Sequence, residues 1–171
     1  MTWIAPDVER THAPFVADER PMLQGWLDQH RRTLLWKCAG LDADTLRLRP
    51  LVPSTLSLLG LVRHLSEVER GWFRIAAAGQ PLDYLYCDEA NPDGDFDDIA
   101  DADPAEAFEV YHREVAAADA SVADLPLDHT FEFRGVRFGL RWVYAHMIEE
   151  YARHNGHADL VREHIDGRTG R

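Results

Sequence analysis

Residues 145–163, AHMIEEYARHNGHADLVRE, bring together residue types that bind metal ions, at the spacing of a helix. Glu150 and His154 are four positions apart, so on a helix they would project from one face, one turn from each other. His146 lies four positions before Glu150, and His157 lies three after His154. A carboxylate beside an imidazole supplies two ligands of a three-ligand metal site. The third ligand has to come from another element.

A second helix is expected to supply that third ligand. Residues 57–78 repeat apolar side chains at three- and four-residue intervals, which predicts an amphipathic helix. Within it, His64 lies between Leu61 and Leu65, close to the apolar side. In a helical bundle, ligands from facing helices converge in the core, where metal sites are commonly built. His64 would therefore meet the pair on the last helix.

Spacing does not choose among the candidate ligands of residues 145–163. His146 competes with Glu150 for one place, and His157 competes with His154 for the other. A second interpretation needs no metal, because the same residue types also make charged, salt-bridged helix faces. That face would consist of Glu149, Glu150, Arg153, His154 and His157.

The ligand types indicate which metals would suit such a site. Two neutral imidazoles and one carboxylate suit zinc, and also nickel or iron in the divalent state. Three protein ligands leave a position open for water or substrate, where the metal can lower the pKa of a bound water or thiol or polarise a carbonyl. A structural zinc is more often closed by four protein ligands, usually including cysteine.

The surrounding pattern predicts four long helices, over residues 21–38, 57–78, 104–125 and 138–165. Residues 41–55 contain two prolines and are expected to form a loop, and residues 130–138, TFEFRGVRF, suit a short hairpin or an extended loop. Four amphipathic segments without a convincing sheet predict an all-α fold, a four-helix bundle with long connecting loops.

The connection of residues 79–102 is rich in acidic residues, with five aspartates between positions 93 and 101. A calcium-binding loop would need a glycine at its sixth position and a glutamate at its last, and this run has neither. Charge runs are usually solvated. The sequence therefore predicts a solvated acidic loop.

The length, net charge and hydropathy of the chain predict its number of domains, its partners and its location. The length of 171 residues suits a single domain over residues 1–171, with residues 1–20 as an irregular lead-in. A net charge of −12 argues against a nucleic-acid partner. No apolar run reaches the roughly 20 residues that a membrane span needs, and the first residues lack a signal-peptide pattern, so we expect a cytoplasmic protein without a membrane partner. Cys38 and Cys87 are then expected to be reduced.

Three segments resemble the DinB-like superfamily of metal-binding four-helix bundles: LQGWLDQHRRTLLWKCAGL, SLLGLVRHLSEVERGWF and HMIEEYARHNGHADLVREHIDG. The chain is most similar to the actinobacterial branch linked to mycothiol-dependent S-transferases. The resemblance implies a metal triad of His64, Glu150 and His154. Many members have histidine where Glu150 stands, and the His, Glu, His set is like that of mycothiol-dependent maleylpyruvate isomerase. His146 and His157 then become neighbours of the site.

The resemblance also implies a function. A metal-dependent S-transferase of this branch would hold mycothiol, its co-substrate, as a metal-bound thiolate that attacks a small electrophile. Arg153, next to a ligand, is a candidate for holding an anionic group of the substrate, and Arg63 is another. The alternatives are a thiol-dependent isomerase, a metal-dependent hydrolase, or a non-enzymatic metal- or ligand-binding bundle of a stress response. A homodimer is compatible with such a bundle, although no segment shows an interface.

Overall fold

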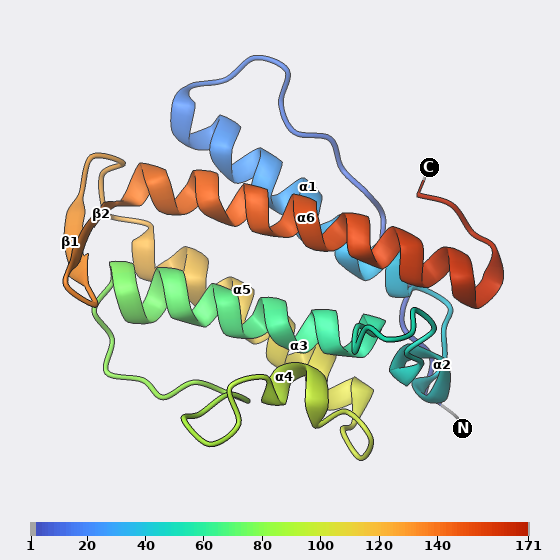
Figure 1. Cartoon of the computed structure of the whole chain (residues 1–171). Helices are drawn as coiled ribbons and strands as arrows, with labels where there is room; N and C mark the ends of the chain where they lie inside the picture. The colour runs from blue at the N-terminus through green and yellow to red at the C-terminus, as the bar shows by residue number, and fades with distance from the viewer. Residues whose placement is uncertain (1–2, 171) are drawn as a thin grey trace.

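The computed structural model describes residues 3–170, and this part of the chain is mostly helical. Four long helices dominate Figure 1: α1 (Glu19–Cys38), α3 (Leu58–Glu69), α5 (Pro104–Val122) and α6 (Leu140–Asp166). A π-helical segment, η1 (Arg70–Ala77), continues α3. The shorter elements are α2 (Ala43–Arg47), α4 (Gly94–Asp97) and the antiparallel strands β1 (Thr130–Phe133) and β2 (Val136–Gly139).

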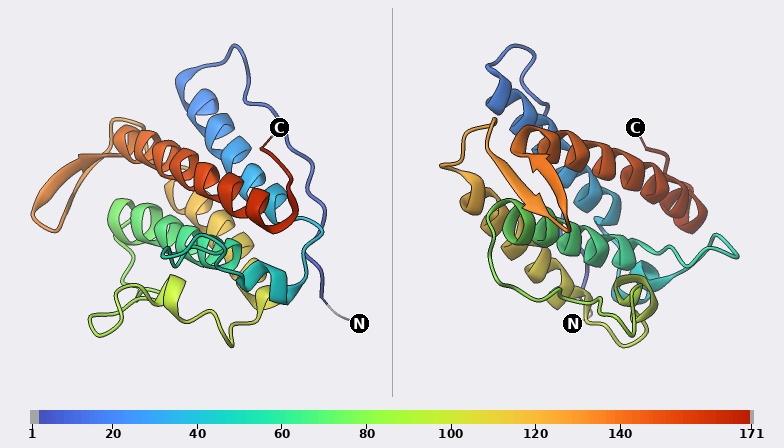
Figure 2. Two further views of the ribbon diagram at one scale, coloured as in Figure 1. Left: turned by 45° about the vertical axis from the view of Figure 1, so that its right-hand side comes forward. Right: turned by 60° about the vertical axis from the view of Figure 1, so that its left-hand side comes forward.

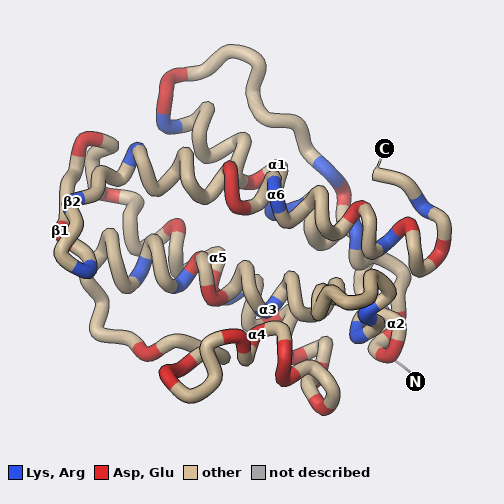
Figure 3. Tube along the Cα trace, in the orientation of Figure 1, with Lys and Arg blue, Asp and Glu red and all other residues tan. Residues whose placement is uncertain are grey.

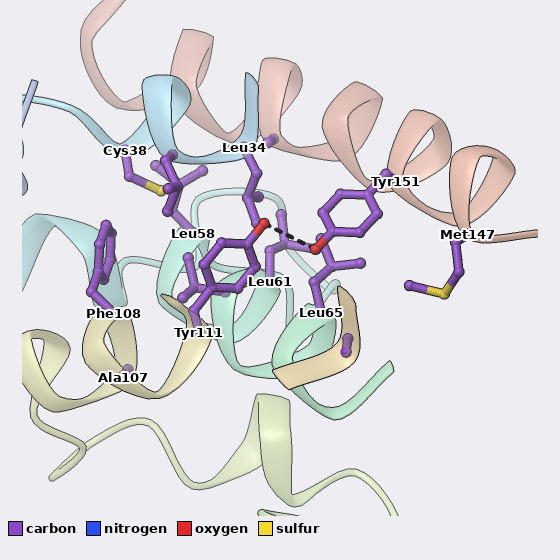
Figure 4. Close-up of a cluster of buried hydrophobic side chains, with 14 of the residues drawn as sticks. Leu34, Cys38, Leu58, Leu61, Leu65, Ala107, Phe108, Tyr111, Met147 and Tyr151 are labelled. Carbon is purple, nitrogen blue, oxygen red and sulfur yellow. Dashed lines mark hydrogen bonds between the residues drawn. The ribbon is translucent and has the colours of Figure 1, made fainter. Parts of the chain in front are cut away.

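The long helices pack side by side around one apolar core. Helix α6 lies against α1, while α3 and η1 lie against α5 and also contact α6 (Figures 1 and 2). The β hairpin lies at one end of α6, and α4 lies against α3 on the side away from α1 (Figure 1). None of the helices described has both the length and the apolar character needed to cross a bilayer. Figure 4 shows part of the core, including Leu34, Leu61, Leu65, Phe108 and Met147.

Local signals in the sequence explain where the helices begin and end. The Ser57 hydroxyl accepts a hydrogen bond from the Gly60 N–H at 3.0 Å, and the Asp103 carboxylate accepts one from the Ala105 N–H at 2.9 Å. Both residues therefore cap helix N-termini that would otherwise leave N–H groups without partners. Gly167 ends α6 with φ of 77°, a left-handed conformation that glycine adopts without strain. The predicted helices over 57–78 and 104–125 and the last helix are confirmed within a few residues.

Three expectations need correction. The predicted loop of residues 41–55 contains the short helix α2, which Asp42 caps by accepting from the Thr45 N–H at 2.9 Å. Residues 130–139 form a two-stranded hairpin, which confirms the first of the two alternatives predicted for this segment, but with this small sheet the chain is mostly helical rather than all-α. The acidic connection contains α4, where Asp95 is 4% exposed and therefore not solvated.

A buried ion pair joins α1 to α3. The Arg31 guanidinium donates to both Glu69 carboxylate oxygens, through Nε at 2.7 Å and Nη2 at 2.8 Å. The Tyr151 hydroxyl of α6 donates to Glu69 Oε1 at 2.8 Å, and the Tyr111 hydroxyl of α5 lies 2.9 Å from that of Tyr151 (Figure 4). One polar network therefore connects all four long helices inside the core.

Replacing Arg31 by methionine should destabilise the fold strongly, because the buried Glu69 carboxylate would lose its cationic partner and keep only the hydrogen bond from the Tyr151 hydroxyl. Breaking a buried ion pair typically costs about 3–5 kcal/mol. The neighbouring Arg32→Met is the matched control, since Arg32 is exposed and its side chain makes a long hydrogen bond, at 3.4 Å, to the Glu9 carbonyl. Urea unfolding of both variants measures the difference. Equal unfolding free energies would contradict a structural role for the network.

Candidate metal centre

His64, Glu150 and His154 come together between α3 and α6. One ligand atom from each lies within 4.8 Å of the other two. Glu150 Oε1 is 3.5 Å from His64 Nε2 and 3.3 Å from His154 Nε2, and the two imidazole rings have centroids 4.6 Å apart. All three side chains are largely withdrawn from solvent, with exposed fractions between 11% and 21%. The helices thus place the three predicted ligands in one cluster.

Hydrogen bonding at His64 leaves one ring nitrogen available to a ligand. Its Nδ1–H donates to the buried Asp95 carboxylate, with 2.7 Å between Nδ1 and Oδ2. Its Nε2 is buried and has no hydrogen-bond partner among the described residues. Metal-binding histidines commonly donate their second N–H to a carboxylate in this way, and an unpartnered buried nitrogen is otherwise unfavourable. The residues present therefore fit a divalent cation bound at Nε2.

Close packing of α4 on α3 brings Asp95 to His64. A side chain at Gly60 would lie 2.9 Å from the Phe96 ring, so this position on α3 must stay small for α4 to approach. The Arg63 guanidinium donates to the carbonyls of Gly94 and Asp95, each at 3.0 Å. The Phe96 ring stacks on the His64 imidazole with centroids 5.0 Å apart. Arg63 therefore holds α4 in place, and Phe96 covers one face of the candidate ligand.

Charge is distributed unevenly over the cluster. Burial lowers the pKa of His64, but the hydrogen bond to Asp95 and the nearby Glu150 carboxylate outweigh it and raise that pKa to about 9. The adjacent His64 ring, against a smaller effect of burial, lowers the pKa of Glu150 to about 2. Burial and the charge on His64 lower the pKa of His154 to about 4. Without a metal, His64 is thus a cationic imidazole between the carboxylates of Asp95 and Glu150, and the neighbouring His154 is neutral. A divalent cation would replace the proton on His64 Nε2.

The two competing histidines occupy different places. His157 Nδ1 lies 3.3 Å from His154 Nδ1, so His157 contacts the nitrogen that faces away from Glu150. His146 forms a second possible cluster with Glu149 and Glu150. Arg153 pairs with Glu149 and lies 3.2 Å from Glu150 Oε2, so the Glu149 carboxylate is already paired with a cation, while Glu150 Oε1 lies toward His64 and His154.

The two arginines next to ligands are engaged within the protein. Arg153 binds Glu149 and Glu150 on its own helix, and Arg63 binds the carbonyls of α4 and lies over the Tyr86 ring at 3.9 Å. Neither guanidinium is directed to an open part of the site by these contacts. The expectation that Arg153 holds an anionic substrate group stays a prediction, and these ion pairs weigh against it.

A cavity of about 970 Å³ opens beside His64. It lies between α3 with η1, the connection of residues 82–95 and the turn of the hairpin, and its size is at the upper end for small-molecule sites. The Glu67 carboxylate anchors the connection by accepting hydrogen bonds from the N–H groups of Leu85, Tyr86 and Cys87. The cavity next to the cluster can therefore hold a small molecule.

Asp95 and the cavity wall were not predicted from the sequence. Asp95 is one of several aspartates in an acidic run, and nothing in the spacing of that run separates the buried one from the exposed ones. A usable signal was the glycine pair, because Gly60 and Gly94 both stand where a Cβ would clash, against Phe96 and the Tyr86 carbonyl. Glycine inside a helix pattern often marks such a close approach.

Comparison with known proteins identifies the family. The model of the family described as Mycothiol-S-transferase matches residues 22–167, which include the three candidate ligands and Asp95. A search of curated proteins gave no match. The family match confirms the resemblance to mycothiol-dependent S-transferases, and the family's name suggests a transferase enzyme with mycothiol as substrate. The chain belongs to the mycothiol-S-transferase family.

Proposed function

We propose that the protein is a metal-dependent S-transferase that joins mycothiol to a small electrophile. The observation that carries the proposal is the buried His64 Nε2, which has no partner among the described residues and faces Glu150 and His154 beside a cavity of about 970 Å³. The family's name supports mycothiol as the thiol and S-transfer as the class of reaction. We also propose that the four long helices form a single-domain, DinB-like four-helix bundle.

The proposed ligands are His64 Nε2, a Glu150 carboxylate oxygen and His154 Nε2, a donor set that suits zinc best and also nickel or iron. When bound, the metal would lower the pKa of the mycothiol thiol so that it is a thiolate at neutral pH. Asp95 orients His64 through the Nδ1–H hydrogen bond, and His157 contacts the other nitrogen of His154. These neighbours hold both rings with Nε2 toward the shared centre.

The reaction needs no nucleophile from the chain. Cys87 lines the cavity, but burial raises its pKa to about 11, and burial raises the pKa of Cys38 to about 12. Neither thiol is therefore a thiolate at neutral pH. In the proposed substitution, the mycothiol sulfur loses its proton to solvent and uses its electron pair to form the S–C bond. The leaving group departs from the carbon with the electron pair of the broken bond.

His64→Ala and His154→Ala should each lower zinc content from about one ion per chain to nearly none after dialysis. Loss of a ligand should exceed the roughly 10- to 100-fold affinity change typical of a residue that only orients one. His112→Ala, at an exposed position of α5, is the matched control and should keep its metal. Elemental analysis gives the stoichiometry. A wild-type protein that neither carries nor takes up zinc would rule out the proposal.

Asp95→Asn should weaken zinc binding by roughly tenfold, because the amide cannot supply the carboxylate charge that orients and polarises His64. Asp97→Asn makes the same chemical change on the same short helix at an exposed position and should leave the affinity unaltered. Competition with a chromophoric chelator measures both affinities. Equal values for the two variants would show that Asp95 has no part in binding the metal.

Zinc-loaded protein should conjugate mycothiol to 1-chloro-2,4-dinitrobenzene, and removing the metal with a chelator should abolish the conjugation until zinc is restored. The physical reason is that the free thiol is mostly protonated at neutral pH. Release of the dinitrophenyl thioether is followed by absorbance, with and without mycothiol. Turnover without any thiol would instead identify a hydrolase, and undiminished conjugation by the metal-free protein would remove the metal from the mechanism.

A further inference from the structure

One side of the cavity beside His64 is aromatic. Trp72, Tyr84 and Phe133 line it, and the Trp72 and Phe133 rings have centroids 6.1 Å apart. Trp72 also contacts the Trp142 ring at 5.1 Å and the His146 ring at 4.8 Å, so a continuous aromatic surface extends from the cavity onto the first turns of α6. Aromatic rings bind other flat rings through offset or edge-on contacts, and they attract cations to their faces.

Acidic side chains also line the cavity. Its lining includes five carboxylates, from Glu67, Asp83, Asp88, Glu89 and Asp95. Three of them are engaged: Glu67 and Asp88 accept backbone N–H bonds, and Asp95 holds His64. No ion pair or hydrogen bond to the Asp83 or Glu89 carboxylate is found within residues 3–170, and both side chains are exposed. Figure 3 shows how acidic residues gather along the connection that carries α4.

Besides His64, the lining of the cavity includes one basic side chain, that of Arg134. Arg134, in the hairpin turn, lines the cavity, donates to the Tyr84 hydroxyl at 3.2 Å and lies over the Phe133 ring at 5.1 Å. A bound divalent metal would carry one net positive charge with Glu150, and the thiolate would cancel it. The negative charge of the chain as a whole adds to the same potential. The cavity therefore keeps an excess of negative charge.

We propose that this cavity is the subsite for the electrophile and that it selects flat aromatic compounds that are neutral or cationic over anionic ones. The inference deepens the proposed function and rests on it. The aromatic wall formed by Trp72, Tyr84 and Phe133 binds the ring of the electrophile. Asp83 and Glu89 set the charge preference, by repelling an anionic substituent and attracting a cationic one.

Binding of unreactive probes tests the charge preference without any turnover. The probes are three N-phenylsuccinimides that carry hydrogen, carboxylate or trimethylammonium at the para position, titrated calorimetrically into the zinc-supplemented full chain. The carboxylate probe should bind at least about tenfold more weakly than the trimethylammonium probe at low salt. The ratio of the affinity for the trimethylammonium probe to that for the carboxylate probe should shrink in 1 M salt, where the Debye length falls to about 3 Å. Equal affinities at low salt would overturn the proposal.

Two variants separate charge from aromatic contact. Glu89→Gln should lower the ratio by about threefold, whereas Glu163→Gln, the same change on an exposed residue near the far end of α6, should leave it unaltered. Trp72→Leu should weaken the hydrogen and carboxylate probes by the same factor, about threefold or more, and the trimethylammonium probe by at least that factor, because its cation also loses contact with the ring face. A ratio that Glu89→Gln does not move would show that the acidic rim does not select. If the ratio holds but mycothiol is never conjugated, only the proposed function fails.

Discussion

The buried ion pair of Arg31 and Glu69 is the constraint on which the rest of the structure depends. Glu69 lies at the end of α3, five residues beyond His64, and its other partner is Tyr151, the residue next to Glu150. A charged pair inside an apolar core is favourable only while its hydrogen bonds are complete. The network therefore sets the register of α3 against α6, and that register decides whether His64 meets Glu150 and His154.

The second constraint is local to the site. His64 becomes a suitable ligand because Asp95 takes up its Nδ1–H, and Asp95 is there because Gly60 lets α4 lie directly on α3. The acidic connection thus has two roles in space. One of its aspartates is buried and orients a ring, while Asp83 and Glu89 stay at the rim of the cavity and give it charge. Both roles depend on carboxylates, and the difference between them is that Asp95 is buried whereas Asp83 and Glu89 are exposed.

In the proposed reaction the protein and its small-molecule partners contribute different groups. The chain supplies side chains that orient the candidate ligands and a cavity lined by carboxylates and aromatic rings. Burial raises the pKa of its own thiols and keeps them protonated. An exogenous thiol as nucleophile agrees with that arrangement. The guanidinium of Arg153 is paired with carboxylates of its own helix, and that of Arg63 donates to backbone carbonyls of α4.

The sequence alone determined the long helices and placed Glu150 and His154 on one face of the last helix, because helix periodicity is a local property of the chain. It also indicated His64, through its place near an apolar stripe, and the family through three segments. Only the tertiary structure decided that Asp95 is buried on His64, that α2 and α4 form in expected loops, and where the cavity lies. The physical reason is that Asp95 lies 31 positions from His64. Contacts between residues that far apart in the sequence depend on how the helices pack, and the helical repeat of apolar residues does not predict them.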